Sequence, residues 1–274
     1  MSEQKEGYLE SFDPELRRAF EFAEQDVDPK LIDHDKVRMR KDALQLSGDA
    51  LFYTLQGEGP TIGLPAIFVR LHVCNLRCTW CDAWYTWNPR TPEFWTESYF
   101  ESFEDVARKI DAAWEGPEYI QKRVIWTGGE PMIQRKQIEE VMNHLPGWEA
   151  EVETNGTLMP TKKQLETFQF NVSPKLNNSE NQHHSMVKPK ILEELNKANS
   201  TFKFVCLSPA DFAEIEEKYL PHIDHDKVII MPQGITEEEV SINAKTLAEP
   251  CKERGYRLLP RLQNICWDGA RRGV

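Results

Sequence analysis

Features that would assign this chain to a membrane or to a nucleic acid are missing from its sequence. No apolar run approaches the roughly 20 residues that a helix needs to cross a bilayer, and the amino-terminal stretch MSEQKEGYLESFDPELRRAF has no signal-peptide core. Positive charge is also scarce, because 33 Lys and Arg residues stand against 45 Asp and Glu residues and leave a net charge of −12. We therefore expect a cytoplasmic protein with no membrane partner and no nucleic-acid partner, since phosphate contacts need clustered cations.

Cysteine is scarce as well, with six residues in the chain. A reducing compartment keeps thiols free, so six cysteines there favour metal, cluster or catalytic use over disulfides. Cys206, Cys251 and Cys266 are scattered, and we interpret them as small buried apolar residues. The other three fall close together in the stretch CNLRCTWCD.

The length of 274 residues and a hydrophobic content of 40% are sufficient for a globular enzyme with a core. Residues 1–47 are rich in Glu, Asp, Lys and Arg, with no strong apolar period beyond a helix expected over residues 14–25. We predict that residues 1–47 form a charged N-terminal extension and that residues 48–274 form the catalytic domain.

Strand-like and helix-like segments alternate after this extension. The strand candidates are AIFVRLHV (66–73), RVIWT (123–127), AEVET (150–154), FNVS (170–173), FKFVC (202–206) and KVIIM (227–231). Their β-branched and aromatic residues predict burial on both faces. Apolar residues recur at helical spacing between the strands, and Thr236 with Glu239 has the capping-box pattern of a helix start. Six strands that are each followed by a helix imply parallel pairing, in either an open doubly wound sheet or a partial barrel.

Three cysteines, Cys74, Cys78 and Cys81, have the spacing C-x3-C-x2-C and directly follow the first predicted strand. Thiolates are soft ligands for zinc and for iron–sulfur clusters. A structural zinc site normally closes with four ligands, and the nearest spare donors, His72 and Asp82, are poorly placed for one. A four-iron cluster on three cysteines has one iron without a protein ligand, and that iron can bind a small molecule. The spacing favours such a cluster, with zinc or incidental buried thiols as the alternatives.

Glycine and polar residues follow the other predicted strands, where the ligands of parallel α/β folds bind. The motifs are TGGEP (127–131), ETNG (153–156), SPK (173–175) and MPQG (231–234). Paired glycines let a backbone approach a ligand closely, and Glu130 can accept hydrogen bonds from an ammonium group. An ordinary turn is the alternative for GGEP and for ETNG. Arg70 lies in an apolar strand, so we expect it to bind a carboxylate, with an exposed surface Arg as the alternative.

The cysteine motif after the first strand of such an array, followed by GGE, is similar to the signature of the radical S-adenosylmethionine (SAM) enzymes. This resemblance implies an α/β fold with a partial (β/α)6 TIM-like barrel of parallel strands. It implies a [4Fe-4S] cluster whose open iron binds SAM, and an electron donor such as flavodoxin or ferredoxin. The radical would come from the cofactor, so no side chain is expected to be the catalytic group.

The stretch FYTLQGEGPTIGLPAIFVRLHVCNLRCTWCDAWYTW, with TGGEP, SPK and LLPRLQNICWDGARRGV, resembles the 7-carboxy-7-deazaguanine synthase family from about Leu51 to Val274. The resemblance implies a carbon–nitrogen lyase that contracts the ring of 6-carboxy-5,6,7,8-tetrahydropterin with loss of ammonia. The product would serve queuosine or related 7-deazapurine biosynthesis. We also expect a small-molecule pterin substrate and a homodimer.

The resemblance carries roles over by position. The implied substrate contacts are Leu55, Gln56, Gly57, Arg70 and Thr127. The implied SAM site comprises Trp80, Cys81, Asp82, Gly129, Ser173, Pro174, Lys175 and Gln233. Family members usually place Ser or Thr after the Cys-Asp pair as a Mg²⁺ ligand, whereas this chain has Ala83; Thr86, a water or a backbone carbonyl are the alternatives. The chain also ends in Val274, where the family often has a Pro carboxylate.

Two other functions stay open at this point. A radical SAM activase would generate a glycyl radical on a partner protein, and a non-catalytic cluster or zinc scaffold would use the N-terminal extension for docking. The segment from QGEG to Arg70 argues against the activase, because it resembles pterin recognition and an activase has no use for it. His183 and His184 are interpreted as a solvated loop rather than as metal ligands.

Overall fold

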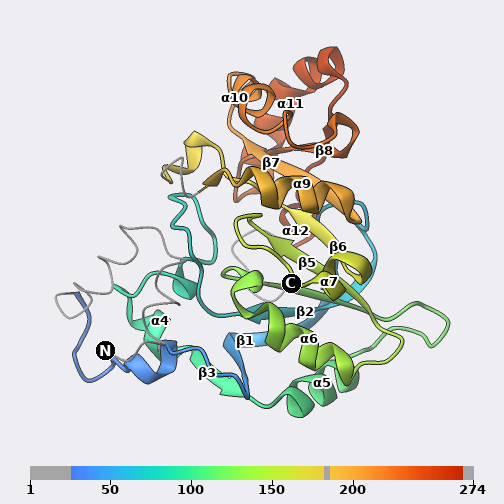
Figure 1. Cartoon of the computed structure of the whole chain (residues 1–274). Coiled ribbons are helices and arrows are strands. Elements are labelled where there is room, and N and C mark those ends of the chain that lie inside the picture. The colour runs from blue at the N-terminus through green and yellow to red at the C-terminus, as the bar shows by residue number, and fades with distance from the viewer. Residues whose placement is uncertain (1–25, 182–185, 268–274) are drawn as a thin grey trace.

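The computed structural model describes residues 26–181 and 186–267 (Figure 1). The helix expected over residues 14–25, His183, His184 and Val274 lie outside the described residues. Nine strands form a single sheet in the order β3-β1-β2-β4-β5-β6-β7-β8-β9. The strands are β1 (Leu44–Leu55), β2 (Pro65–Leu71), β3 (Ser98–Glu101), β4 (Arg123–Gly128), β5 (Glu149–Thr154), β6 (Gln169–Val172), β7 (Ser200–Cys206), β8 (Val228–Pro232) and β9 (Arg257–Leu258).

Helices occupy most of the connections between parallel strands. The α-helices are α4 (Pro92–Thr96), α5 (Phe103–Ala112), α6 (Arg135–Asn143), α7 (Lys162–Thr167), α9 (Pro189–Lys197), α10 (Asp211–Lys218), α11 (Glu237–Arg254) and α12 (Leu262–Cys266). The 3-10 helices are η1 (His34–Val37), η2 (Trp84–Thr86), η3 (Pro131–Gln134), η4 (Asn177–Ser179) and η5 (His225–Lys227). The capping box predicted at Thr236 and Glu239 is present at the start of α11.

The strand order distinguishes the two architectures that the sequence left open. From β2 to β9 every neighbouring pair is parallel, and the strands follow one another in chain order. A doubly wound sheet would reverse its order at a switch point and place helices on both faces. Right-handed crossovers that all step in one direction place the helices on one face instead. The predicted partial barrel of parallel strands is therefore confirmed.

All six predicted strands are present, but three strands were not predicted. β1 pairs antiparallel with both β2 and β3 at one edge of the sheet, and β9 is a two-residue strand at the other edge. The register of β1 shifts between Leu46 and Leu51, at a bulge that contains Gly48 with φ of +57°. This bulge interrupts the alternation of side chains that would have identified the strand. The predicted boundary after residue 47 lies inside β1, and the division into an extension and a catalytic domain stays a prediction.

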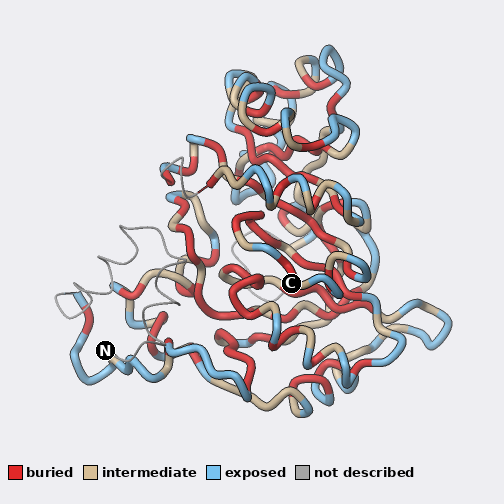
Figure 2. Tube along the Cα trace, viewed as in Figure 1, coloured by how far each residue is buried: buried red, intermediate tan, exposed pale blue. Residues whose placement is uncertain are grey.

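One face of the sheet forms the hydrophobic core with the helices. Its members include Val69, Trp126, Val152, Phe170 and Phe204, all fully buried. The opposite face, here called the inner face, carries the alternate residues, and many of them are polar. The predicted burial on both faces is confirmed, but the buried inner face is largely polar. The strands are buried along most of their length (Figure 2), so the polar side chains of the inner face must find partners within the protein.

Two further findings concern the predictions made from composition. Cys206 and Cys251 are buried as expected, but Cys266 is exposed because it lies at the end of the short helix α12, in which Asn264 is the buried residue. None of the helices in the described ranges is both long and apolar enough to span a membrane.

Candidate active site

A row of polar side chains crosses the inner face at the level of Arg70. Arg70 on β2 is in register with Thr127 on β4. Farther along the sheet Glu153 on β5 is in register with Asn171 on β6, and Asn171 with Thr201 on β7. Side chains in register on adjacent strands point to the same face, so parallel pairing brings these five residues together.

Arg70 is the cation at one end of this row. Its guanidinium carbon lies 5.7 Å from the centre of the Phe52 ring, and the side chain is partly buried. Within residues 26–181 and 186–267 it forms no ion pair with a carboxylate. A partly buried Arg that stacks on a ring and has no protein carboxylate is suited to hold the carboxylate of a ligand.

The turn that joins β1 to β2 folds over the same inner face. Gln56 is 1% exposed, and its Nε2 donates to Glu153 Oε1 at 3.1 Å and to Glu151 Oε2 at 3.3 Å. The Thr61 hydroxyl donates to Glu151 Oε2 at 2.9 Å. Glu151 itself pairs with Arg123 at the start of β4. Polar contacts therefore hold the turn on the inner face of the sheet. The helices on the other face are held by apolar contacts instead.

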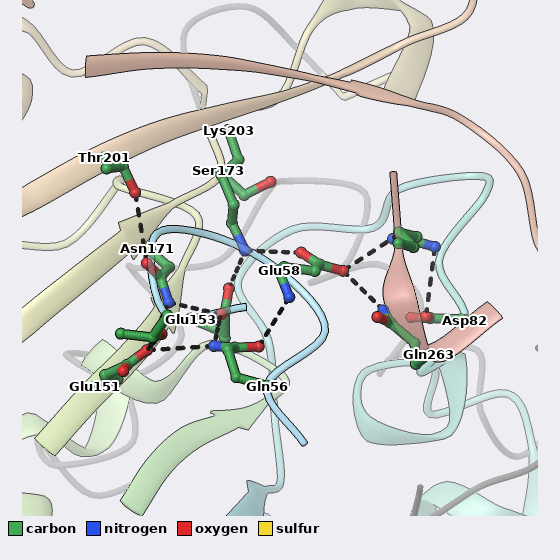
Figure 3. Close-up of polar contacts among 12 residues, drawn as sticks. Gln56, Glu58, Asp82, Glu151, Glu153, Asn171, Ser173, Thr201, Lys203 and Gln263 are labelled. Carbon is green, nitrogen blue, oxygen red and sulfur yellow. Dashed lines mark hydrogen bonds and ion pairs between the residues drawn. The ribbon is translucent and has the colours of Figure 1, made fainter. Parts of the chain in front are cut away.

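A buried lysine completes the docking of this turn (Figure 3). Lys203 of β7 is 1% exposed, and its Nζ lies 2.7 Å from Glu58 Oε2 in the turn and 2.5 Å from Glu153 Oε2 on β5. Asn171 donates from Nδ2 to Glu153 Oε1 at 2.9 Å. The ammonium group is thus held between two carboxylates that come from different parts of the chain.

The chain after β9 closes this network from the other side. Arg261 Nε lies 3.4 Å from Glu58 Oε1, and Gln263 Nε2 donates to the same oxygen at 2.9 Å. The Leu262 amide donates to the Gly57 carbonyl oxygen at 3.0 Å. A Cβ on Gly57 would lie 1.8 Å from Gln263 Oε1, so a larger residue here would force the Gln263 side chain to move.

The two carboxylates beside Lys203 differ in their pKa. Burial acts to raise the pKa of Glu58, but the charges of Lys203 and Arg261 outweigh it and lower the pKa to about 2. Burial raises the pKa of Glu153, because the Lys203 charge does not fully offset it and the Glu58 charge adds to it. The pKa of Lys203 is raised, since the attraction of the two carboxylates exceeds the effect of burial.

The cysteine loop follows β2 and is held by the segments that follow β5 and β6. Asn75 donates from Nδ2 to the Thr157 hydroxyl at 2.8 Å and accepts from Asn155 Nδ2 at 2.9 Å. The Thr79 amide donates to the Ser179 carbonyl oxygen at 3.2 Å. Neighbouring strand ends therefore fix the conformation of the loop that carries the three thiols.

The three thiols fit a cluster ligand set. Burial raises the pKa of Cys74 and Cys78, and raises that of Cys81 to about 12, so each thiolate needs a positive partner. Asn181 donates from Nδ2 to Cys78 Sγ at 3.2 Å. In the part of the chain that the structure describes, no three His, Cys, Asp or Glu side chains are grouped so that they could hold a metal ion. A four-iron cluster differs from a single ion because each thiolate binds a separate iron, so the sulfur atoms need not converge.

The paired glycines have a structural role that the sequence did not indicate. The Gly129 amide donates to the Leu71 carbonyl oxygen at 3.0 Å, and a Cβ there would lie 2.0 Å from the Val73 carbonyl oxygen. Glu130 is 1% exposed and accepts from Thr154 Oγ1 and from the Asn155 amide, both at 2.7 Å. The motif thus packs β4 against the start of the cysteine loop. The Glu130 carboxylate joins strand ends, and its contact with an ammonium group stays a prediction.

Several residues expected at the SAM site lie beside the cysteine loop. The Lys175 Nζ lies 5.3 Å from the centre of the Trp80 ring and donates to Ser173 Oγ at 2.8 Å. The Trp80 indole donates to the Asn178 carbonyl oxygen at 3.1 Å, and Pro174 is buried between its neighbours. The backbone amide of Gln233 donates to the Cys206 carbonyl oxygen at 2.9 Å, which joins the ends of β7 and β8.

The side chains after Cys81 offer few oxygen ligands for Mg²⁺. Ala83 has no side-chain oxygen, and the buried Thr86 hydroxyl donates to the Ala83 carbonyl oxygen at 2.7 Å. The Asp82 side chain is 64% exposed, and the Arg261 Nη1 lies 3.9 Å from its Oδ2. Mg²⁺ needs an octahedral set of oxygen ligands. One exposed carboxylate next to a guanidinium does not provide it.

Sequence reasoning missed the buried network around Lys203. Asn171 and Arg261 were not singled out, and Glu58 and Glu153 were noted only as members of the motifs QGEG and ETNG, although a signal for Lys203 was present. Lys203 is a charge inside the apolar strand FKFVC, which is the same feature that singled out Arg70 in its own strand. The residues that pair with it could not be identified, because they depend on the register of β5 and on the path of the turn.

Comparisons with known proteins agree with this geometry. The model of the Radical SAM superfamily matches residues 69–229. A 7-carboxy-7-deazaguanine synthase from Pyrobaculum aerophilum is 32% identical over 225 residues, covering 81% of this chain and 94% of the relative. One from Rhodopirellula baltica is 33% identical over 244 residues, covering 81% of this chain and 86% of the relative. The crystal structure of QueE from Escherichia coli has a TM-score of 0.59 and 25% identity, and the match covers 80% of this chain and 94% of that one.

Proposed function

The chain belongs to the radical SAM superfamily and, within it, to the 7-carboxy-7-deazaguanine synthases, and from that membership we propose how its residues carry out the reaction. The enzyme is a carbon–nitrogen lyase that converts 6-carboxy-5,6,7,8-tetrahydropterin to 7-carboxy-7-deazaguanine with loss of ammonia. When bound, the [4Fe-4S] cluster and SAM supply a 5′-deoxyadenosyl radical that takes a hydrogen atom from the pterin. The protein holds these groups and the substrate in place.

At the cofactor end, Cys74, Cys78 and Cys81 would hold the cluster, which would bind SAM. Trp80, Asp82, Gly129, Ser173, Pro174, Lys175 and Gln233 would contact SAM. The cation–ring contact of Lys175 with Trp80, and the hydrogen bond of Lys175 to Ser173, support a shared role for these residues.

At the substrate end, Arg70 binds the pterin carboxylate. The observation that carries this assignment is that Arg70 lies four residues before Cys74 on β2, in register with Thr127, without an ion pair to any described carboxylate. Leu55, Gln56 and Gly57 would contact the pterin ring, since the turn that holds them is folded onto the same inner face.

Three finer points are part of the proposal. The reaction proceeds without Mg²⁺, because Ala83, Thr86 and Arg261 leave no oxygen ligand set next to Asp82. The protein works in the reducing cytoplasm, where an electron donor such as flavodoxin or ferredoxin reduces the cluster. It forms a homodimer, which sedimentation of the purified protein would test.

The decisive experiment is an anaerobic assay of the reconstituted protein with the carboxypterin, SAM and a reductant. We expect 7-carboxy-7-deazaguanine and ammonia in equal amounts. Cys78→Ala abolishes both, whereas Cys206→Ala, which removes a buried thiol elsewhere, retains them. An intact cluster that responds to SAM but gives no deazaguanine would refute the assignment.

A further inference from the structure

We propose that Lys203 is a positioning residue for the pterin end of the site, acting through Glu58 and Glu153 on the turn Gln56–Gly59. The inference rests on the proposed function for the identity of the substrate. Among the described residues Lys203 makes no hydrogen bond or ion pair with the cysteine loop. Its network reaches that loop indirectly, because Arg261 lies 3.4 Å from Glu58 and 3.9 Å from the exposed Asp82, so we expect the main effect at the end where the turn lies.

The ammonium group joins three segments that are distant in the chain. Lys203 is 145 residues from Glu58 and 50 residues from Glu153, and its Nζ contacts both carboxylates at 2.7 Å and 2.5 Å. Glu58 belongs to the turn, Glu153 to β5 and Lys203 to β7. A single buried cation therefore fixes the distance between the turn and two strands of the inner face.

The contacts of Glu153 extend this control to Gln56. Lys203 occupies Oε2 of Glu153, while Gln56 donates to Oε1 of the same carboxylate at 3.1 Å. Lys203 thus acts on the turn twice, directly at Glu58 and through Glu153 at Gln56. Gln56 and its neighbour Gly57 are the residues proposed to contact the pterin, so a displaced turn changes the substrate end first.

The cost of burying this network indicates that fold stability is not its purpose. Two cations, Lys203 and Arg261, balance the two carboxylates, but burying four charges is rarely more favourable than an apolar cluster of the same volume. The same strand buries Phe202 and Phe204 on its other face. Apolar residues in place of the whole network would therefore suit the fold, whereas an apolar residue at position 203 alone leaves Glu58 and Glu153 without their shared cation. Only a charged group at this position can hold both carboxylates in fixed positions.

The test compares Lys203→Met, Lys203→Arg and a matched control, Glu149→Gln, in the reconstituted full-length protein. Glu149 is a half-exposed carboxylate on β5 that pairs with Arg123 and does not touch the Lys203 network. We expect Lys203→Met to raise the KM for the carboxypterin about tenfold or more, with a smaller change in kcat. Lys203→Arg recovers part of this loss, and Glu149→Gln matches the wild type.

Two further measurements separate positioning from loss of fold and from failure of the proposed function. The change that SAM causes in the EPR spectrum of the cluster should be the same in all variants. Hydrogen exchange of residues 56–64 should be faster in Lys203→Met, whatever the substrate is. If Lys203→Met does not fold, Glu58→Gln is used in the same assays, because it keeps the shape of the side chain and removes its charge.

The inference is overturned if the folded variant, with its SAM response intact, has the wild-type KM and wild-type exchange in the turn. If the wild-type protein itself produces no deazaguanine, the proposed function fails, and the exchange data alone decide whether Lys203 positions the turn.

Discussion

Along β7 the outer face carries Phe202, Phe204 and Cys206, all fully buried under the helices, whereas the inner face carries Thr201, Lys203 and Val205. Along β5 the same contrast separates Ala150 and Val152 from Glu151 and Glu153. Successive residues of one strand thus have different roles. The outer residues stabilise the fold by burying apolar surface, and the inner residues form a polar surface that faces the proposed ligands.

A lysine placed on the outer face of β7, one residue after Lys203, should disrupt this division most severely. Phe204→Lys places an ammonium group among Phe212, Ile215 and Tyr219 of the outer core, without a carboxylate to pair with it. Its burial costs several kcal/mol or more, which is a large part of the about 5–15 kcal/mol that stabilises a typical domain. We expect no soluble folded protein, measured by circular dichroism. A folded Phe204→Lys variant would mean that the outer face tolerates charge as the inner face does.

Replacing Arg70 on the inner face should affect catalysis and leave the fold intact. Arg70→Gln is expected to lower kcat/KM for the carboxypterin about a hundredfold, because a charge-assisted contact to the substrate carboxylate is lost. Its free energy of unfolding should change by less than about 0.5 kcal/mol, since the described part of the chain contains no ion pair of Arg70. Arg108→Gln on the exposed side of α5 is the matched control. An unchanged KM in Arg70→Gln would show that another group binds the carboxylate.

The acid side of the stability curve sharpens the comparison, because the inner face carries carboxylates whose pKa values are shifted by burial and by neighbouring charges. The pKa of Glu58 is lowered to about 2, since the Lys203 and Arg261 charges outweigh burial. A carboxylate with a lowered folded pKa contributes stability above its unfolded pKa and loses it as the pH falls through the folded value. We therefore expect the free energy of unfolding to fall between about pH 5 and pH 2, and to fall less in Glu58→Gln.

The measurement for this prediction is urea unfolding at a series of pH values. Glu149→Gln serves as the control and should keep the wild-type slope. Glu153 opposes Glu58, because burial raises its pKa, so that its ionisation destabilises the fold as the pH rises. Equal slopes in the wild type and in Glu58→Gln would contradict the charge pairing described for the network.

The smallest expected effect concerns Mg²⁺. In metal-depleted buffer, addition of Mg²⁺ should change the rate of deazaguanine formation by less than about twofold, because the residues beside Asp82 supply no oxygen ligand set. The assay is the anaerobic one described above, with the cluster content measured before and after depletion. A strict requirement for Mg²⁺ would show that water and backbone oxygens complete the site without Ser or Thr at position 83.

The strands and the cysteine loop could be predicted from local sequence, because each is encoded by neighbouring residues. The six apolar segments and the spacing of Cys74, Cys78 and Cys81 need no knowledge of distant contacts. β1 was missed because the bulge at Gly48 breaks its alternation. The polar inner face was missed although AEVET alternates Ala150 and Val152 with Glu151 and Glu153. On other strands the same face carries apolar residues such as Ile125, Ile229 and Met231, so the alternation does not recur from strand to strand.

The buried network illustrates what local patterns cannot contain. Glu58 and Lys203 meet only when the turn folds back over the sheet and β7 takes its place two strands from β5. The residues next to Glu58 and Lys203 in the sequence do not indicate that these two side chains form a contact. Lys203 could have been flagged as a charge in an apolar strand, but its partners and its effect on Gln56 required the register.

The β1–β2 hairpin has an evolutionary consequence. Its turn begins where β1 ends and returns directly to β2, whereas the cysteine loop leaves the opposite end of β2. On the proposed function, mutations confined to this short hairpin tip would alter which molecules the enzyme accepts, while the cysteine loop keeps its sequence. Proteins that descend from one ancestral gene would then differ in substrate through substitutions in this one turn.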